Sequence, residues 1–441
     1  MSLNRKQLIN LLICVFGIQF GSALQVANLS AIFKELGAAT QYVSVLWLVA
    51  PITGLFTQPI IGVISDNYRS RFGSRRPIMF ICMVLSVVSM VLLPNVSTLW
   101  LAVILAWFLD AGTGIYQPLR ALIIEKTEKR ERPLAFGWFA VFSGLGAIIA
   151  STMPYLFNLL TTKNVYELTN TENHIPLNVK WAFYAGAVAF LIFTLWTLIH
   201  TEETPRPKEK HTNNIMDIIK HKLFKSFMEK LKDTSVSIKR TAVIQFFAWI
   251  GMFSVWSYIN LTIAQNYFGL PVIHPEASPQ YQTIMLHAVT WTGLTIGLYE
   301  FVNMLFNLSF PKLADKYSVR LIYAVALLIG AISLMVVTIF HQKAALLITM
   351  SFFGITWGAI LSCPYTLASA DLQGKDAGFY FGIFNAAVTL PQIVGGIIFG
   401  FSFHNLLHSS AANVLRVGAC SLLIASLIAF FQWKKFDREA N

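Results

Sequence analysis

Two acidic residues, Asp110 and Glu300, stand near the middle of apolar segments that are otherwise suited to a lipid bilayer. A charged side chain at the bilayer centre costs about 2.5–3.5 kcal/mol on insertion scales, so such residues usually mark functional sites. An acid in a low-dielectric cavity can take up and release a proton near physiological pH. We therefore predict proton coupling by Asp110, and either coupling or substrate binding by Glu300. The alternative for each acid is a structural role, as a hydrogen-bonded group that orders its own helix.

Polar side chains follow both acids at helical spacing. Gln117 lies seven residues after Asp110, and Asn303 lies three residues after Glu300. Residues three, four or seven apart share one face of an α-helix. We expect two polar faces that avoid lipid and line a common cavity.

Aromatic and amide residues on the other apolar segments extend this pattern. Flat rings beside amides suit a sugar, which offers apolar ring faces and a fringe of hydroxyl groups. For any single tryptophan the alternative is ordinary helix packing. The candidate substrate ligands are Ser22, Gln25, Asn28, Gln58, Gln117, Arg120, Trp249, Trp256, Asn303, Asn385 and Gln392.

Arg120 lies ten residues after Asp110. Ten residues of α-helix span roughly 15 Å, so the two side chains cannot pair on one helix. Arg120 is therefore a candidate gate partner or a hydrogen-bond donor to the substrate. The alternative is a basic residue that only orients the protein in the membrane.

A dense charge cluster lies between two apolar segments, at residues 66–76. Gly73 supplies a turn, and Pro77 opens the next helix where its missing N–H has no cost. We predict a hinge at the membrane surface. The candidate residues of a cytoplasmic gate are Asp66, Arg71, Arg75, Arg76, Asp315 and Arg320.

The composition points to a membrane protein. Of 441 residues, 56% are hydrophobic and 12% are charged, whereas soluble domains carry roughly 25% charged residues. The net charge of +12 could indicate nucleic-acid binding, but the basic residues are confined to short segments between apolar stretches. This distribution follows the positive-inside rule, and we expect a lipid bilayer and no nucleic acid as partner.

A membrane-spanning helix needs about 20 apolar residues, and the chain offers twelve such segments. Lys and Arg gather in every second loop and at both ends, which predicts that both termini are cytoplasmic. A signal peptide at the basic N-terminus is the alternative to a retained first helix. The predicted spans are 8–28, 43–64, 78–97, 98–120, 135–158, 180–200, 241–263, 284–310, 321–341, 344–370, 379–403 and 412–433.

One long hydrophilic segment divides the chain. The predicted domains are a six-helix bundle at 1–200, a cytoplasmic loop at 201–240 and a second six-helix bundle at 241–441. Apolar residues four apart, interleaved with lysines, predict an amphipathic helix in the latter part of the loop. It serves as a tether between the halves or, alternatively, binds a partner.

The two halves repeat each other. Asp66 and Asp315, Pro118 and Pro364, and the Phe-Gly pairs at 136–137 and 381–382 are separated by about 245–250 residues. Paired repeats with a binding site at their interface are typical of secondary transporters.

Enzyme chemistry has no support in the sequence. We find no nucleophile elbow, no phosphate-binding glycine loop and no cluster with metal-ligand spacing, so we expect neither catalysis nor a cofactor. The segment Ser143 to Gly146 lies in a span and predicts close helix packing. The four cysteines lie in apolar spans and are interpreted as core residues.

Several motifs resemble the sucrose-transporter branch of the glycoside–pentoside–hexuronide cation symporters, within the major facilitator superfamily. Residues 19–25 read QFGSALQ, residues 46–77 read LWLVAPITGLFTQPIIGVISDNYRSRFGSRRP, and residues 117–122 read QPLRAL. The second half adds Pro364-Tyr365, GIFN at 382–385 and Pro391-Gln392. The match covers most of the N-terminal half and is patchier in the C-terminal half.

The resemblance implies an all-α membrane protein with the major facilitator fold, which imports a sucrose- or maltose-like glycoside with a proton by alternating access. It makes Asp110 the proton acceptor, Arg120 a transport residue and Asp66 part of the gate. Ser22 replaces the family's tryptophan, which puts sucrose-type stacking in doubt, and Asn67 and Ser74 interrupt the basic pattern of the gate. Span 2 lacks the acids of related sodium-coupled carriers, which favours a proton over sodium.

Two other functions remain open at this stage: a carrier or exporter of a non-sugar compound, and a non-transporting membrane sensor. The short loops and tails lead us to expect a bacterial inner membrane. We also expect a monomer.

Overall fold

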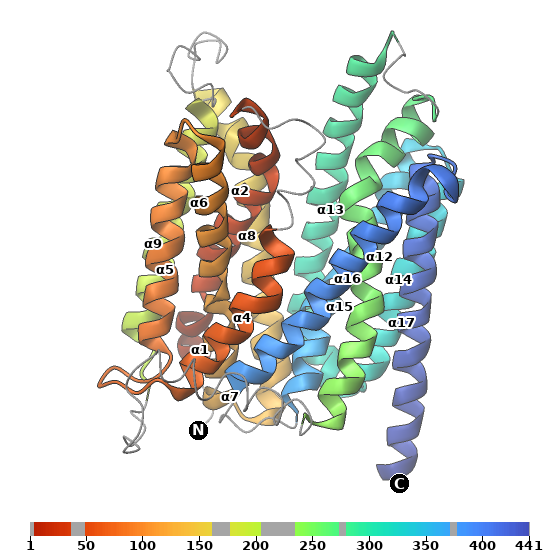
Figure 1. The fold of residues 1–441 in the computed structure, drawn as a ribbon. Helices are drawn as coiled ribbons and strands as arrows, with labels where there is room; N and C mark the ends of the chain where they lie inside the picture. Colours follow the sequence, from red (N-terminus) through yellow and green to blue (C-terminus); the bar gives the residue numbers. More distant parts are fainter. Residues whose placement is uncertain are drawn as a thin grey trace. The chain divides into compact units, whose positions relative to one another are not determined.

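Every long element of the computed structural model is an α-helix (Figure 1). The structure describes residues 4–36, 49–160, 177–203, 234–272, 279–370 and 377–440. The α-helices are α1 Arg5–Leu12, α2 Cys14–Glu35, α4 Val49–Asn67, α5 Arg76–Leu92, α6 Leu99–Gly112, α7 Tyr116–Lys126, α8 Arg132–Leu160, α9 Leu177–His200, α12 Val236–Phe268, α13 Tyr281–Lys316, α14 Val319–Ile339, α15 Lys343–Ser369, α16 Ala377–Asn405 and α17 Ala411–Ala440. Three short 3₁₀ helices are η1 Leu93–Asn95, η2 Thr113–Ile115 and η3 Lys129–Glu131.

The chain divides into two compact units. Unit 1 contains residues 1–235 and 371–386, and unit 2 contains residues 236–370 and 387–441. The first turns of α16 therefore group with the N-terminal helices. The amphipathic helix expected in the central loop lies outside the described residues.

Each unit is a helical bundle. In unit 1, α2 packs against α8 and α9, while α5 packs against α6 and α9 (Figure 1). In unit 2, α17 packs against α12 and α14, while α15 packs against α13 and α14. Buried aromatic residues such as Phe136 and Phe190 in unit 1, and Phe353 and Tyr323 in unit 2, fill the space between the helices.

Ten helical segments of the described part are long and apolar enough to cross a membrane. Each of the twelve predicted spans is helical over most of its described length, although some extend beyond the end of their helix, as at residues 96–97 and 340–341. Of the helices in these spans, α4 and α13 are not among the ten. The number of twelve transmembrane helices thus stays a prediction.

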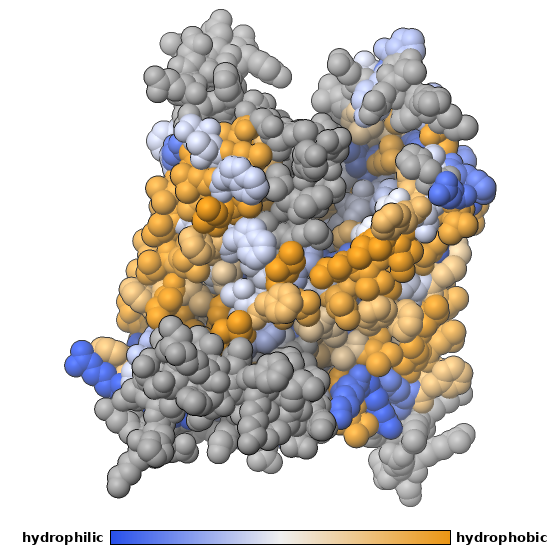
Figure 2. All heavy atoms as spheres, in the orientation of Figure 1, coloured by the Kyte–Doolittle hydropathy of each residue, from blue (hydrophilic) through white to orange (hydrophobic). Residues whose placement is uncertain are grey.

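The outward surfaces of the helices are strongly apolar. Large hydrophobic side chains such as Trp100 on α6, Ile332 on α14 and Ile348 on α15 are more than half exposed. Figure 2 shows hydrophobic side chains over much of the visible helical surface. Of the four cysteines, Cys420 lies exposed on α17, which corrects its interpretation as a core residue, whereas the other three are buried. The exposed apolar surface of the helices is stable in lipid and would be an aggregation hazard in water.

The segment predicted as one continuous span at 98–120 is interrupted. Between α6 and α7, η2 replaces the α-helical hydrogen bonds, so that the N–H of Thr113 bonds to the carbonyl of Asp110 and the N–H of Tyr116 bonds to that of Thr113. Pro118 has no N–H to give to the carbonyl four residues earlier, that of Gly114, which weakens the α-helix at this point. A 3₁₀ stretch inside a helix often marks a functional hinge.

The predicted close packing at Ser143–Gly146 is present. A Cβ atom added to Gly146 of α8 would lie 2.5 Å from the carbonyl oxygen of Phe16 on α2. Only glycine permits this approach of the two backbones.

Gly146→Ala is expected to lower the apparent melting temperature in detergent, because the methyl group forces α2 and α8 apart at a cost of about 1–3 kcal/mol. Gly400→Ala on α16 is the control, since a Cβ atom there meets nothing within 4 Å. Its melting temperature should equal or exceed that of the wild type. Equal melting of Gly146→Ala and the wild type would contradict the packing argument.

Candidate functional site

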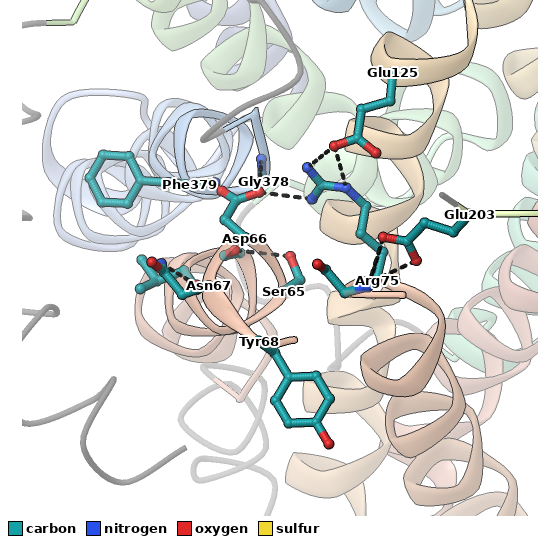
Figure 3. Close-up of polar contacts among 12 residues, drawn as sticks. Ser65, Asp66, Asn67, Tyr68, Arg75, Glu125, Glu203, Gly378 and Phe379 are labelled. Atoms are coloured by element: carbon teal, nitrogen blue, oxygen red, sulfur yellow. Dashed lines mark hydrogen bonds and ion pairs between the residues drawn. The ribbon is translucent and has the colours of Figure 1, made fainter. Parts of the chain in front are cut away.

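The carboxylate of Asp66 holds the start of α16 against α4 within unit 1 (Figure 3). Its oxygens accept the backbone N–H groups of Gly378 at 3.2 Å and Phe379 at 2.7 Å. These N–H groups belong to the first turn of α16, where the helix dipole favours a negative charge. Asp66 is only 3% exposed, so the interaction is shielded from water.

Arg75 joins Asp66 to Glu125 of α7. Its Nη1 lies 2.8 Å from Asp66 Oδ1, and its Nη2 lies 2.7 Å from Glu125 Oε1. The Arg75 side chain is fully buried. Burial opposes the charged guanidinium, but the carboxylates of Asp66 and Glu125 outweigh this effect and raise the pKa of Arg75 above its ordinary value. One buried cation thus compensates two acids that belong to different helices.

Glu203, directly after α9, caps the start of α5. Its carboxylate accepts the backbone N–H groups of Ser74, Arg75 and Arg76 at 2.8–3.2 Å. Gly73 precedes them with a φ of 99°, and a Cβ atom there would lie 2.2 Å from a Glu203 oxygen. Glycine is needed here both for the backbone conformation and for the space.

Of the six predicted gate residues, the structure places Asp66 and Arg75 in direct contact. Arg71 is exposed with its guanidinium over the ring of Phe72, and Arg76 is partly buried. Asp315 and Arg320 lie at the end of α13 and the start of α14, in unit 2, where Asp315 is exposed. The sequence did not lead us to predict Glu125 and Glu203 as gate residues. The one signal in the sequence is that each is an acidic residue at the end of an apolar span.

Asp110 lies at the end of α6, directly before the 3₁₀ break. The residue is partly buried, yet its Oδ2 is shielded from solvent and has no hydrogen-bond partner among the described residues. Its backbone carbonyl accepts the hydroxyl of Thr113 at 2.6 Å. A carboxyl oxygen in an apolar span with no hydrogen-bond partner among the described residues can take up a proton without losing a bond to one of them.

Amide and aromatic side chains gather on α7, beyond the break. Gln117, fully buried, donates its Nε2 hydrogen to Oε1 of Gln58 on α4. The Tyr116 hydroxyl donates to Gln19 Oε1 on α2 at 3.1 Å. The guanidinium of Arg120 lies 5.3 Å from the ring centre of Tyr116. We call these five residues the unit 1 polar cluster. It connects α2, α4 and α7.

The second acid, Glu300, stands in a hydrogen-bonded network in unit 2. Its Oε2 accepts Asn303 Nδ2 at 2.9 Å, and its Oε1 accepts Trp357 Nε1 of α15 at 2.9 Å. Asn303 in turn accepts Asn307 Nδ2 at 2.8 Å. The polar residues of α13 thus form a connected chain with Trp357, and all four side chains are buried. The common cavity that the two polar faces were expected to line stays a prediction.

Three tryptophans pack together beside this network, which one of them, Trp357, contacts through its bond to Glu300. The ring centres of Trp249 and Trp256 on α12 and of Trp357 on α15 lie 5.5–5.9 Å apart, edge to face. Trp357 was missed as a site residue, because in the sequence it is a single tryptophan in an apolar span. We call Glu300, Asn303, Asn307 and the three tryptophans the unit 2 cluster.

The remaining substrate candidates lie outside both clusters. Ser22 donates its hydroxyl to the carbonyl of Ile18, and Gln392 donates to the carbonyl of Val388. Asn385 donates to the carbonyl of Gly54 at 3.1 Å. Gln25 is buried. The side chain of Asn28 lies outside the described residues.

Comparison with known proteins supports a membrane carrier. A family model described as Major Facilitator Superfamily matches residues 11–396. The chain is 26% identical to the sucrose transport protein SUC4 of Arabidopsis thaliana, over 94% of the chain and 87% of that protein. It is 22% identical to the general alpha-glucoside permease of Schizosaccharomyces pombe, over 70% of the chain and 56% of that protein. The resemblance to the sucrose-transporter branch is confirmed.

A solved structure shows the same fold. The chain matches the transporter FucP in its outward conformation with a TM-score of 0.70, at 14% identity, over 97% of the chain and 99% of FucP. At this identity the match establishes the all-helical fold. The family model, the named relatives and the ten long apolar helices show that the chain is a multi-pass integral membrane protein.

Arg75→Met is expected to destabilise the protein by about 3–5 kcal/mol, because it leaves the carboxylates of Asp66 and Glu125 without their cation. Thermal unfolding in detergent measures the loss. Arg71→Met is the matched control, since Arg71 is exposed, and it should melt like the wild type. Equal melting temperatures of the two variants would show that the buried ion pairs do not stabilise unit 1.

Proposed function

Because the chain belongs to the Major Facilitator Superfamily, we propose that it is a symporter that imports a glycoside together with a proton. Relatives named as sucrose transporters and as an alpha-glucoside permease support a sucrose- or maltose-like substrate. The relatives are transport proteins, which supports transport without catalysis. The observation that carries the proposal is the Oδ2 of Asp110, which has no hydrogen-bond partner among the described residues and lies directly before the 3₁₀ break that leads into α7.

The proposed topology has twelve transmembrane helices in two six-helix bundles, with both termini in the cytoplasm. The alternation of basic and non-basic loops supports this orientation. The named relatives come from a plant and a yeast, so the bacterial inner membrane expected from the short loops stays a prediction.

Asp110 is the proposed proton carrier. An acid that couples transport must exchange its proton as the protein changes state, and a carboxyl oxygen held by no other side chain can do so without breaking a bond. The 3₁₀ break after Asp110 would let α7 move relative to α6, and with it the amide of Gln117, which bonds to Gln58 on α4. Proton binding and substrate binding would then act on the same hinge.

Each cluster is proposed, within its own unit, as a group of sugar-binding side chains. Arg120, whose guanidinium faces the rings of Tyr116 and Phe139, provides hydrogen-bond donors in unit 1. The aromatic rings and amides of unit 2 provide apolar faces and polar groups of the kind that carbohydrate sites use.

Asp66, Arg75 and Glu125 are proposed as the cytoplasmic gate. The first turn of α16 depends on the Asp66 carboxylate, and α16 continues from unit 1 into unit 2. Release of that turn would free α16 to move during the transport cycle.

Asp110→Asn keeps the size of the side chain but cannot exchange a proton at physiological pH. In proteoliposomes, it should lose accumulation of sugar under a proton gradient while it retains counterflow, in which no net proton movement is needed. Counterflow with a panel of mono- and disaccharides, with and without a proton ionophore, identifies the substrate first. The control is Glu202→Gln, an exposed acid after α9, which should accumulate sugar normally. Wild-type accumulation by Asp110→Asn would refute the coupling role.

Asp66→Asn removes the charge that holds the first turn of α16. We expect a cysteine placed at Ala377, which is buried at the start of α16, to react faster with a maleimide in this variant than in the wild type. The native cysteines are replaced in both backgrounds, and Glu202→Gln again serves as the control. Unchanged labelling would contradict the gate.

A further inference from the structure

We propose that Trp357 positions the carboxylate of Glu300 to accept a hydroxyl group of the glycoside, and that this pair determines which sugar is accepted. The inference depends on the proposed function, since it assigns a specificity determinant to the same transport site. It assigns Glu300 to sugar recognition and leaves proton coupling to Asp110.

The geometry of Glu300 is that of a fixed acceptor. Trp357 Nε1 donates to one carboxylate oxygen and Asn303 Nδ2 donates to the other, each at 2.9 Å. The two donors come from different helices, α15 and α13, so the carboxylate plane is set by the packing of the helices. An ionised carboxylate has about four acceptor positions, so two stay available for hydroxyl groups.

The carboxyl groups of Asp110 and Glu300 differ in their hydrogen bonds, and this difference suits proton coupling by Asp110 and sugar recognition by Glu300. Protonation of either Glu300 oxygen would weaken a bond to Trp357 or Asn303, whereas Asp110 Oδ2 has no partner to lose among the described residues. A proton carrier needs an oxygen that can bind a proton without losing a bond, as in Asp110. A rigid acceptor needs a carboxylate whose oxygens are held by donors, as in Glu300.

The aromatic surface beside Glu300 fits a sugar ring. Trp249 and Trp357 are each 7% exposed, whereas Trp256, which contacts both, is 43% exposed. Two buried rings thus hold a third with part of its surface accessible. A pyranose presents C–H groups to such a ring and hydroxyl groups at its rim, which a nearby carboxylate can bind.

The face of α13 that carries Glu300 also has open space. Gly293 and Gly297 precede Glu300 by seven and three residues and lie on the same side of the helix. Both are exposed, and a Cβ atom added to either would meet nothing within 4 Å. The surface of α13 one and two turns before Glu300 is therefore unfilled, and a ligand bound there would lie close to the carboxylate.

Trp357→Phe tests the positioning role, because it keeps an aromatic ring and removes the N–H donor. In counterflow, the half-saturation concentration for the preferred glycoside should rise about tenfold or more, as expected for loss of a hydrogen bond to a charged group. The wild type rejects one deoxy analogue of the glycoside most strongly, and the variant should discriminate less against this analogue. The maximal rate and its pH profile should stay unchanged. The control is Trp100→Phe, at a tryptophan that is 75% exposed on α6.

Glu300→Gln provides a second test if Trp357→Phe does not fold. It should lose the same discrimination and still accumulate saturating sugar under a proton gradient. The proposal is overturned if Glu300→Gln abolishes accumulation but keeps wild-type affinity and discrimination, or if Trp357→Phe discriminates like the wild type.

The two proposals fail in different ways. Wild-type protein that takes up no glycoside refutes the transport function itself. Wild-type protein that accumulates a glycoside with a proton, beside a Trp357→Phe variant of unchanged selectivity, refutes only the role of Trp357.

Discussion

A charged or polar side chain inside an apolar helix bundle is tolerated only where a neighbouring group compensates the loss of water. In this protein the compensation comes from other helices. Asp66 of α4 is satisfied by Arg75 and by the first turn of α16, and Glu300 of α13 is satisfied partly by Trp357 of α15. Each compensated charge therefore also fixes the distance between helices, and it connects segments that are far apart in the sequence.

The exception is informative. Asp110 has an oxygen that no side chain among the described residues satisfies, and it lies where the helix changes from α to 3₁₀ geometry. An uncompensated acid at a break in its own helix is costly for stability, and such costs persist mainly at functional sites. The contrast between Asp110 and Glu300 separates two acids that look alike in the sequence, since both stand mid-span with polar residues at helical spacing.

The arrangement of charges at the start of α5 illustrates how local and distant interactions combine. Gly73 adopts a backbone conformation that other residues rarely adopt, which turns three consecutive N–H groups toward Glu203. The same turn directs the Arg75 side chain between Asp66 and Glu125. Thus one short loop brings together α4, α5, α7 and the end of α9.

The sequence by itself determined the all-helical membrane fold, the membership in its family, the polar face of α13 and the close packing at Gly146. Each depends on composition, helical spacing or short motifs, which can be identified in the sequence without the tertiary contacts. The tertiary structure decided which charged residues meet: Glu125 and Glu203 joined the predicted Asp66 and Arg75, and Trp357 joined Glu300. It also revealed the break after Asp110 in a span expected to be continuous. The contacts of Glu125, Glu203 and Trp357 join residues 50 or more positions apart, which spacing along one helix does not specify. The turn before α5 and the break after Asp110 depend on the backbone at Gly73 and Pro118.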